Sequence, residues 1–176
     1  LLPGAAPLRA EQPWREQAYQ VALDLRIDTR YLKRKDGLQH IAQSFIDLCE
    51  QDSEPVVAFF PSYTYAESVL AYLEEMAPEV RVHLQPRGLD SEGQREFLET
   101  SLLTARGMFL ILGSFASEGI DLLGGKVRTA MVVSPGLPEV NLLRQIRQEH
   151  WDKQSPGSGF LHCYVEPGLT KVQQAL

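Results

Sequence analysis

The residues best suited to chemistry lie in one short loop that follows an apolar run at positions 108–112. Residues 112–125 read LGSFASEGIDLLGG. Small residues such as Gly113, Ser114 and Gly119 let a backbone approach a ligand closely, and exposed N–H groups suit a phosphate or a ribose. Asp121 can accept hydrogen bonds from a sugar hydroxyl or from an arginine. From these residues alone, a plain turn whose carboxylate caps a helix is an equally good interpretation.

Two enzymatic interpretations of this loop are weaker. The stretch FASEG at 115–119 has phenylalanine in place of the first glycine of the nucleophile elbow G-x-S-x-G. Because that turn is too tight for a large side chain, Ser117 is a poor candidate for a hydrolase nucleophile. Glu118 and Asp121 could form a general acid/base pair, but no other residue of the sequence marks a pocket for their substrate.

Motifs of self-sufficient nucleotide enzymes are absent. The sequence contains no G-x-x-x-x-G-K-[ST] phosphate loop and no G-x-G-x-x-G after its first predicted strand. Cys49 and Cys163 lie far apart, and the four histidines show no metal-ligand spacing. We therefore expect no disulfide framework and no metal site, as is usual for an intracellular protein.

Composition indicates an ordinary soluble globular domain. The 176 residues are 44% apolar and 23% charged, which is enough for one domain with a buried core. No apolar run approaches the roughly 20 residues of a membrane span. The net charge of −6 argues against a surface coated for nucleic acid but leaves room for a local site. By charge alone, the cluster RIDTRYLKRK at 26–35, which includes Arg30, is better explained as a solvated helix start than as a phosphate contact.

The apolar periodicity predicts strands that alternate with helices. Alternating patterns and short apolar runs predict strands at 19–27, 55–60, 80–84, 107–112, 129–134 and 160–165. Helical spacing and capping residues predict helices at 38–49, from Ser62 or Thr64 to Met76, from a Ser91/Gln94 capping box to Leu102, at 138–151, and from Thr170 onward. This order predicts an α/β domain with a mainly parallel sheet.

The carboxyl edge of such a sheet is the candidate site. In parallel sheets, ligands gather where the strands end. Residues 60–64, 113–121 and 134–138 each follow a predicted strand. We therefore expect these three loops to lie along one edge.

Five segments together resemble the second RecA-like, or C-terminal helicase, domain of the XPD/DinG family of superfamily-two, DNA-dependent ATPases. They are RIDTRYLKRK (26–35), VVAFFPSYTYAESV (56–69), GSFASEGIDL (113–122), VVSPGLPEVN (132–141) and GFLHCYVEPGLTKVQQAL (159–176). The second resembles helicase motif four, the third motif five, and the last the approach to motif six. The final segment is most similar to bacterial DinG-type proteins. The resemblance implies a three-layer RecA-like lobe at 18–176, preceded by an N-terminal extension at 1–17.

The resemblance also implies roles in ATP binding. Gly119 and Asp121 would contact ATP or the arginine that senses it, on the face that meets the first RecA-like lobe. Glu118 belongs to the same site and would couple it to DNA. Gln174 matches the glutamine that opens motif six.

For DNA, the resemblance implies contacts with a single strand. Ser62 and Tyr63 match the motif-four loop that holds its phosphate backbone, and Ser114 and Arg30 would add further contacts. Hydroxyl and backbone N–H groups can hold phosphates without a large positive charge, so a net charge of −6 is tolerable.

The sequence departs from the family pattern at its end, because Leu176 precedes the motif-six arginines that support phosphoryl transfer. The phosphate loop, the Mg²⁺ box and the four cysteines that hold an iron–sulfur cluster in many relatives belong to the first lobe. ATP and Mg²⁺ would therefore be held mainly by that lobe of the same parent protein, and this chain does not say whether the parent carries the cluster. We expect a lobe, inactive alone, of a cytoplasmic 5′-to-3′ DNA helicase that acts in DNA repair or replication.

The alternative from another functional class is a non-catalytic RecA-like module that binds DNA or a protein partner. The absence of every hydrolytic motif favours it. A complete motor needs several hundred more residues, so the length of the native open reading frame separates the two hypotheses.

Overall fold

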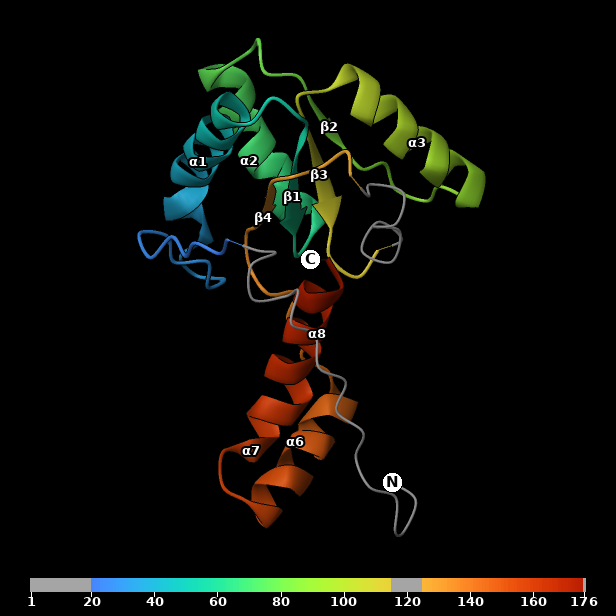
Figure 1. The fold of residues 1–176 in the computed structure, drawn as a ribbon. Helices are drawn as coiled ribbons and strands as arrows, with labels where there is room; N and C mark the ends of the chain where they lie inside the picture. Colours follow the sequence, from blue (N-terminus) through green and yellow to red (C-terminus); the bar gives the residue numbers. More distant parts are fainter. Residues whose placement is uncertain (1–19, 115–124, 176) are drawn as a thin grey trace.

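The computed structural model describes residues 20–114 and 125–175 of the chain. Its centre is a four-stranded sheet with the order β2-β3-β1-β4, in which every pairing is parallel (Figure 1). The strands are β1 (Val56–Phe60), β2 (Val82–Leu84), β3 (Gly107–Ile111) and β4 (Ala130–Val132). These strands confirm the predicted α/β fold with a parallel sheet.

Helices cover both faces of the sheet. The first face packs against α1 (Leu38–Gln51) and α2 (Tyr63–Met76), and the second against α3 (Ser91–Thr104) and the end of α8 (Glu166–Ala175) (Figure 1). Alternate residues of β1 point to opposite faces: Ala58 and Phe60 pack with the first pair of helices, whereas Val57 and Phe59 pack with α3 and α8. All residues of β1 and β3 are buried for this reason, as their continuous apolar runs predict.

An aromatic cluster fills the space between β3 and α1. The rings of Phe45 and Phe109 meet edge to face at 4.9 Å between centroids, and Phe60 lies 4.6 Å from Phe109. Gly107 opens β3 directly under the Phe45 ring. A Cβ atom at position 107 would press on that ring, 2.8 Å from its Cε1, and would lie 3.1 Å from the carbonyl oxygen of Val56. Only glycine leaves room for the ring here.

Gly107→Ala is expected to lower the free energy of unfolding by about 1–3 kcal/mol, because the new methyl group overpacks a core that is already closely packed around the Phe45 ring. Backbone entropy favours alanine in a strand, so a loss must come from the clash. Urea unfolding followed by circular dichroism measures it. In a Phe45→Leu background the same substitution should cost less. Equal costs in the two backgrounds would contradict the steric explanation.

The C-terminal helices form a stalk that stands away from the sheet (Figure 1). It consists of α6 (Leu142–Gln154), α7 (Ser158–Phe160), a π-helical turn η3 (Leu161–Val165) and α8. The stalk has two arms: α6 is the first, and α7, η3 and α8 form the second. Gly159 of α7 lets the arms approach closely, since a Cβ there would strike the carbonyl oxygen of Gln148 and lie 2.9 Å from Asp152 Cγ. The far end of α8 returns to the sheet, where Val172 and Ala175 pack against its second face.

Two predicted strands are wrong. Residues 20–27 form no strand, and Val21, Leu23 and Leu25 are 80%, 82% and 90% exposed, because no strand among the described residues pairs with this alternating segment. Residues 160–165 are helical rather than extended. Cys163 and Tyr164 are buried on one helical face, and the π-helical turn that precedes Pro167 lets the helix continue past a residue that lacks an N–H.

Several helix boundaries also differ from the prediction. Asp90, not Ser91, caps α3, with its carboxylate accepting from the N–H of Gly93. Asn141 caps α6, which therefore begins after the predicted position 138. Thr170 does not start a helix, because it lies inside α8. Within the described part of the chain, no helix is long and apolar enough to cross a membrane.

Candidate functional site

The loops that follow β1, β3 and β4 meet at the carboxyl edge of the sheet, as the parallel pairing requires. Lys171 of α8 joins two of them: its side chain crosses the backbone of Gly113, after β3, and of Gly136, after β4. A Cβ at Gly113 would lie 3.1 Å from Lys171 Cε, and one at Gly136 would lie 3.4 Å from Lys171 Cδ and 3.3 Å from Leu112 Cβ. Gly113 has a φ of 75°, which favours glycine as well. The two glycines thus make the space that brings a lysine to this edge.

A buried glutamine links the strand ends. Gln85 directly follows β2 and is 3% exposed. Its Oε1 accepts a hydrogen bond of 3.0 Å from the N–H of Ile111 and lies 3.0 Å from the Ser114 hydroxyl, while its Nε2 donates to the Tyr63 hydroxyl at 3.1 Å. Since β2 ends before it can pair with Ile111, the Gln85 side chain supplies the missing acceptor. One residue therefore connects the start of α2 with the end of β3.

Ser62 is the N-cap of α2. Its hydroxyl accepts from the N–H of Tyr65 at 3.4 Å, so the structure selects Ser62 over Thr64 for this role. The N-terminus of α2, with the N–H groups of its first turn and its positive dipole end, lies at the same edge of the sheet. This end of a helix favours an anion such as a phosphate.

Tyr63 is fixed on two sides. Its hydroxyl accepts from Gln85 and donates to the carbonyl oxygen of Pro86 at 3.2 Å. The guanidinium of Arg87 lies 4.3 Å from the centre of its ring and is paired with Glu67 at 2.9 Å. An Arg87–Glu67 ion pair thus lies beside the α2 N-terminus.

The other predicted site residues fall in different places. Arg30 makes its side-chain hydrogen bonds to Asp28, and these bonds lower the pKa of the Asp28 carboxyl to about 2. Arg34 of the same basic cluster is the residue that reaches α2, with its guanidinium 5.0 Å from the ring centre of Tyr65. Gln174 is exposed in the last turn of α8. Glu118, Gly119 and Asp121 lie outside the described residues.

The structure thus brings Ser62, Tyr63 and Ser114 to one edge and adds three residues that the sequence analysis missed. Gln85 and Arg87 lie outside the five segments that resemble the family, and Lys171 lies in the last of them without matching a motif residue, so the only available signal was their position. Gln85 and Arg87 follow a predicted strand, and Lys171 lies one helical turn before Gln174. Hydroxyl groups, a helix N-terminus and a lysine are groups that hold phosphates, whereas Arg87 would have to exchange Glu67 for the phosphate. Within residues 20–114 and 125–175, no group of three or more acidic, histidine or cysteine residues could hold a metal ion.

A parallel sheet covered on both faces, with its candidate site at the carboxyl edge, defines the class as a RecA-like α/β lobe. The family model of the helicase C-terminal domain matches residues 45–176, so the chain belongs to that family. Two solved structures that resemble it are titled as XPD proteins. A protein titled XPD helicase superposes with a TM-score of 0.64 at 14% identity over 86% of this chain, and Xpd4 of S. tokodaii with 0.58 at 18% over 85%.

The chain spans only 27% and 28% of the length of these two helicases. A comparison with curated protein sequences finds no match. At these identities the structural likeness concerns the fold, and the family match identifies the domain as a C-terminal helicase lobe of the XPD/DinG type.

Proposed function

We propose that this chain is the second RecA-like lobe of an ATP-dependent DNA helicase that moves 5′ to 3′ and resembles bacterial DinG-type proteins. In this role it supplies half of the ATP cleft and half of the track for single-stranded DNA. The observation that supports the proposal best is the link made by Gln85. In a chain of this family, it ties Tyr63, in the motif-four loop, to Ile111 and Ser114, at the start of the motif-five loop.

The DNA track is proposed along the carboxyl edge of the sheet. The N-terminus of α2 presents N–H groups beside Ser62, and Tyr63, Arg87 and Ser114 lie next to it. These groups contact phosphates, not base edges, so the grip tolerates any sequence, as a translocating motor requires. Arg30 would contact the same strand farther along it.

The ATP half-site is proposed on the motif-five side. Glu118, Gly119, Asp121 and Gln174 would face the first RecA-like lobe of the same polypeptide, which would hold ATP and Mg²⁺ for the most part. Closure of the two lobes on ATP and their opening after hydrolysis would move the grip along the strand. The link through Gln85 would pass a movement of the motif-five loop directly to Tyr63.

The remaining assignments follow from this role. Residues 18–176 form the lobe and residues 1–17 an extension. The lobe alone would not hydrolyse ATP, and an iron–sulfur cluster, if the parent has one, would lie in the first lobe. The parent would act in the cytoplasm, in DNA repair or replication.

Ser62→Asp is expected to weaken binding of single-stranded DNA by about tenfold or more, because a carboxylate at the α2 N-terminus repels the phosphate that the serine would hold. Aspartate caps a helix as well as serine does, so the fold should be unaffected. Fluorescence anisotropy of a labelled oligo(dT) with the 176-residue chain measures the affinity.

Ser62→Asn is the matched control. Asparagine also caps the helix but adds no charge, so it should bind DNA within about threefold of the original chain. Equal affinities of the Asp and Asn variants would remove Ser62 from the track. Strong binding that did not fall as salt rises would contradict phosphate contacts in general.

A further inference from the structure

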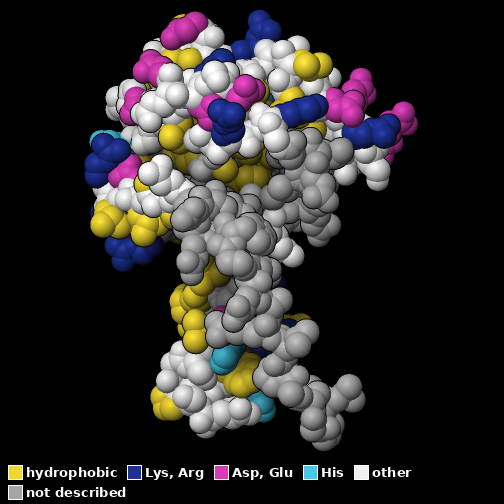
Figure 2. Space-filling model, viewed as in Figure 1, with side chains coloured by type: hydrophobic (Ala, Val, Ile, Leu, Met, Phe, Trp, Pro, Cys, Tyr) yellow, Lys and Arg dark blue, Asp and Glu magenta, His cyan; other side chains and the backbone are white. Residues whose placement is uncertain are grey.

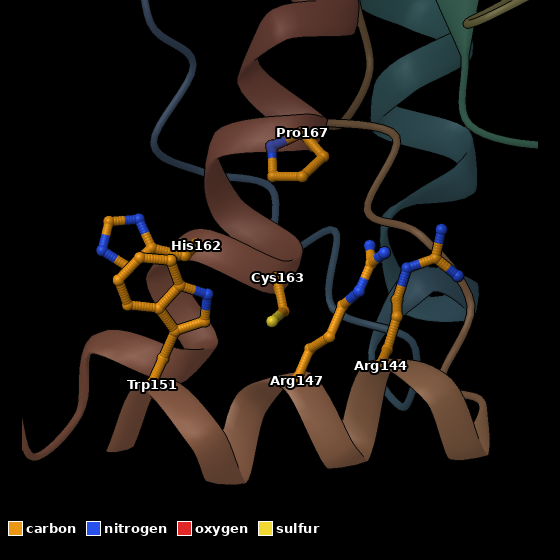
Figure 3. Close-up of a pocket in the computed structure, with 6 residues that line it drawn as sticks. All are labelled: Arg144, Arg147, Trp151, His162, Cys163 and Pro167. Atoms are coloured by element: carbon orange, nitrogen blue, oxygen red, sulfur yellow. The ribbon is translucent and has the colours of Figure 1, made fainter. Parts of the chain in front are cut away.

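The stalk contains a pocket that the proposed motor function does not use. It lies where α6 meets η3 and the start of α8, away from the strand ends, and encloses about 300 Å³ (Figure 3). Its walls come from both arms of the stalk: Arg144, Arg147, Trp151, His162, Cys163 and Pro167.

One end of this pocket is cationic. Figure 3 shows the side chains of Arg144 and Arg147 rising from the same side of α6 at one end of the pocket. The Arg144 guanidinium donates one hydrogen bond, to the carbonyl oxygen of Glu139 at 3.1 Å. In the part of the chain that the structure describes, Arg147 makes no hydrogen bond and no ion pair. The described lining includes no carboxylate; Glu166, outside it, is paired with His162 at 2.8 Å. Two guanidinium groups without an acidic partner fit a bidentate anion, above all a phosphate.

The other end is aromatic. The rings of Trp151 and His162 lie against each other with 4.5 Å between centroids and an angle of 43°. Trp151 is still 39% exposed, so part of its ring is available for a further contact. Cys163 and Pro167 line the stretch between the rings and the arginines with apolar atoms (Figure 3). Exposed tryptophan next to arginine is a combination that stacks nucleobases and holds their phosphates.

We infer that this pocket binds one nucleotide unit, with its phosphate on Arg144 and Arg147 and its base on Trp151. The order of groups along the pocket, cationic, then apolar, then aromatic, is the order of phosphate, sugar and base in a nucleotide. The unit can come from a free nucleotide or from a single strand of DNA. The second source would give the lobe a DNA contact separate from the carboxyl edge. The pocket would bind this unit independently of the ATP cleft and of the track at Ser62.

The test uses tryptophan fluorescence of the 176-residue chain. The sequence has two tryptophans, and Trp14→Phe leaves Trp151 as the only reporter. Two probes are titrated separately: dTMP, and oligo(dT) of about 12 nucleotides, a length within the range of known single-strand sites. Quenching by either probe is expected, because a stacked base quenches the excited indole ring by electron transfer. Quenching by dTMP and oligo(dT) alike points to any nucleotide unit, and quenching by oligo(dT) alone points to the strand.

Substitution of the arginines makes the test specific. The double variant Arg144→Gln/Arg147→Gln should weaken the quenching interaction at least tenfold, whereas Arg95→Gln, an exposed arginine on α3 at the opposite end of the molecule, should leave it unchanged (Figure 1). Ser62→Asp should also leave Trp151 quenching by dTMP unchanged, which separates this pocket from the track. No quenching by either probe, or equal affinities of the double variant and Arg95→Gln, would overturn the inference.

Discussion

Gln85→Met in the parent protein is expected to reduce DNA-stimulated ATP hydrolysis at least about tenfold. Methionine keeps the length and most of the volume of glutamine but removes the side-chain hydrogen bonds of Gln85 to Tyr63, Ile111 and Ser114. Tyr63 and Ser114 retain the carbonyl oxygens of Pro86 and Ile111 as partners, so the N–H of Ile111 is the group left without one. One unsatisfied buried N–H costs about 1–3 kcal/mol, which a folded lobe can tolerate. The larger loss should therefore appear in the coupling of DNA to ATP.

The variant Gln85→Glu distinguishes a role of Gln85 in positioning the two loops from a role in stabilising the fold alone. A carboxylate still accepts from the N–H of Ile111 and from the Ser114 hydroxyl, and only the donation to Tyr63 is lost. This variant should recover most of the stimulated activity. Tyr63→Phe in the Gln85→Met background should add little, because the two residues act through one contact. Activities that follow thermal stability alone across these variants would reduce Gln85 to a structural residue. Unchanged stimulation in Gln85→Met would contradict the role altogether.

Asp121→Ala is expected to abolish ATP-driven unwinding by the parent protein. The segment GSFASEGIDL resembles motif five, and in the proposed site the carboxylate of Asp121 contacts ATP or the arginine that senses it. Correct placement of an arginine on the transferring phosphoryl group is worth about 10³–10⁵ in rate, so loss of the group that orients it should cost at least about 10². The isolated lobe should remain folded.

Unwinding of a fluorescently labelled duplex measures this loss, and circular dichroism of the 176-residue chain checks the fold. Asp36→Ala is the matched control, because Asp36 is an exposed carboxylate on the 3₁₀ turn η2 (Arg34–Gly37) whose nearest cation, Lys33, is 3.8 Å away. It should unwind DNA normally. Normal unwinding in Asp121→Ala would remove Asp121 from the site.

The sheet could be predicted because its strands have unambiguous patterns. VVAFF at 56–60 and GMFLI at 107–111 are continuous apolar runs, which are typical of a strand covered on both faces. Parallel pairing then brings the following loops to one edge, so the location of the candidate site was available from the sequence as well.

Two strand predictions were wrong because a local sequence pattern does not show which other segments will pack or pair with it. The alternation at 20–27 needs a neighbouring strand, and none pairs with it within the described residues. The run at 160–165 is short enough for either a strand or a helix. The segment is helical because this conformation buries Cys163 and Tyr164 in the stalk and because its π-helical turn accommodates Pro167.

The residues that organise the site were not predictable for a related reason. Gln85 is an ordinary polar residue after a short strand, and its importance comes from Ile111, which lies 26 positions away. Lys171 reaches the edge only because Gly113 and Gly136 leave space for its side chain. Such contacts depend on tertiary packing, which spacing along the chain does not contain.

The measurement that tests the central claim most directly is ATP hydrolysis by the native full-length protein that contains this lobe, with and without single-stranded DNA. We predict hydrolysis that the strand stimulates strongly, as expected if the loops at the carboxyl edge couple a DNA track to an ATP cleft. Absence of hydrolysis both with and without DNA would contradict the account and would identify the lobe as a binding module that keeps the fold of a motor without its activity.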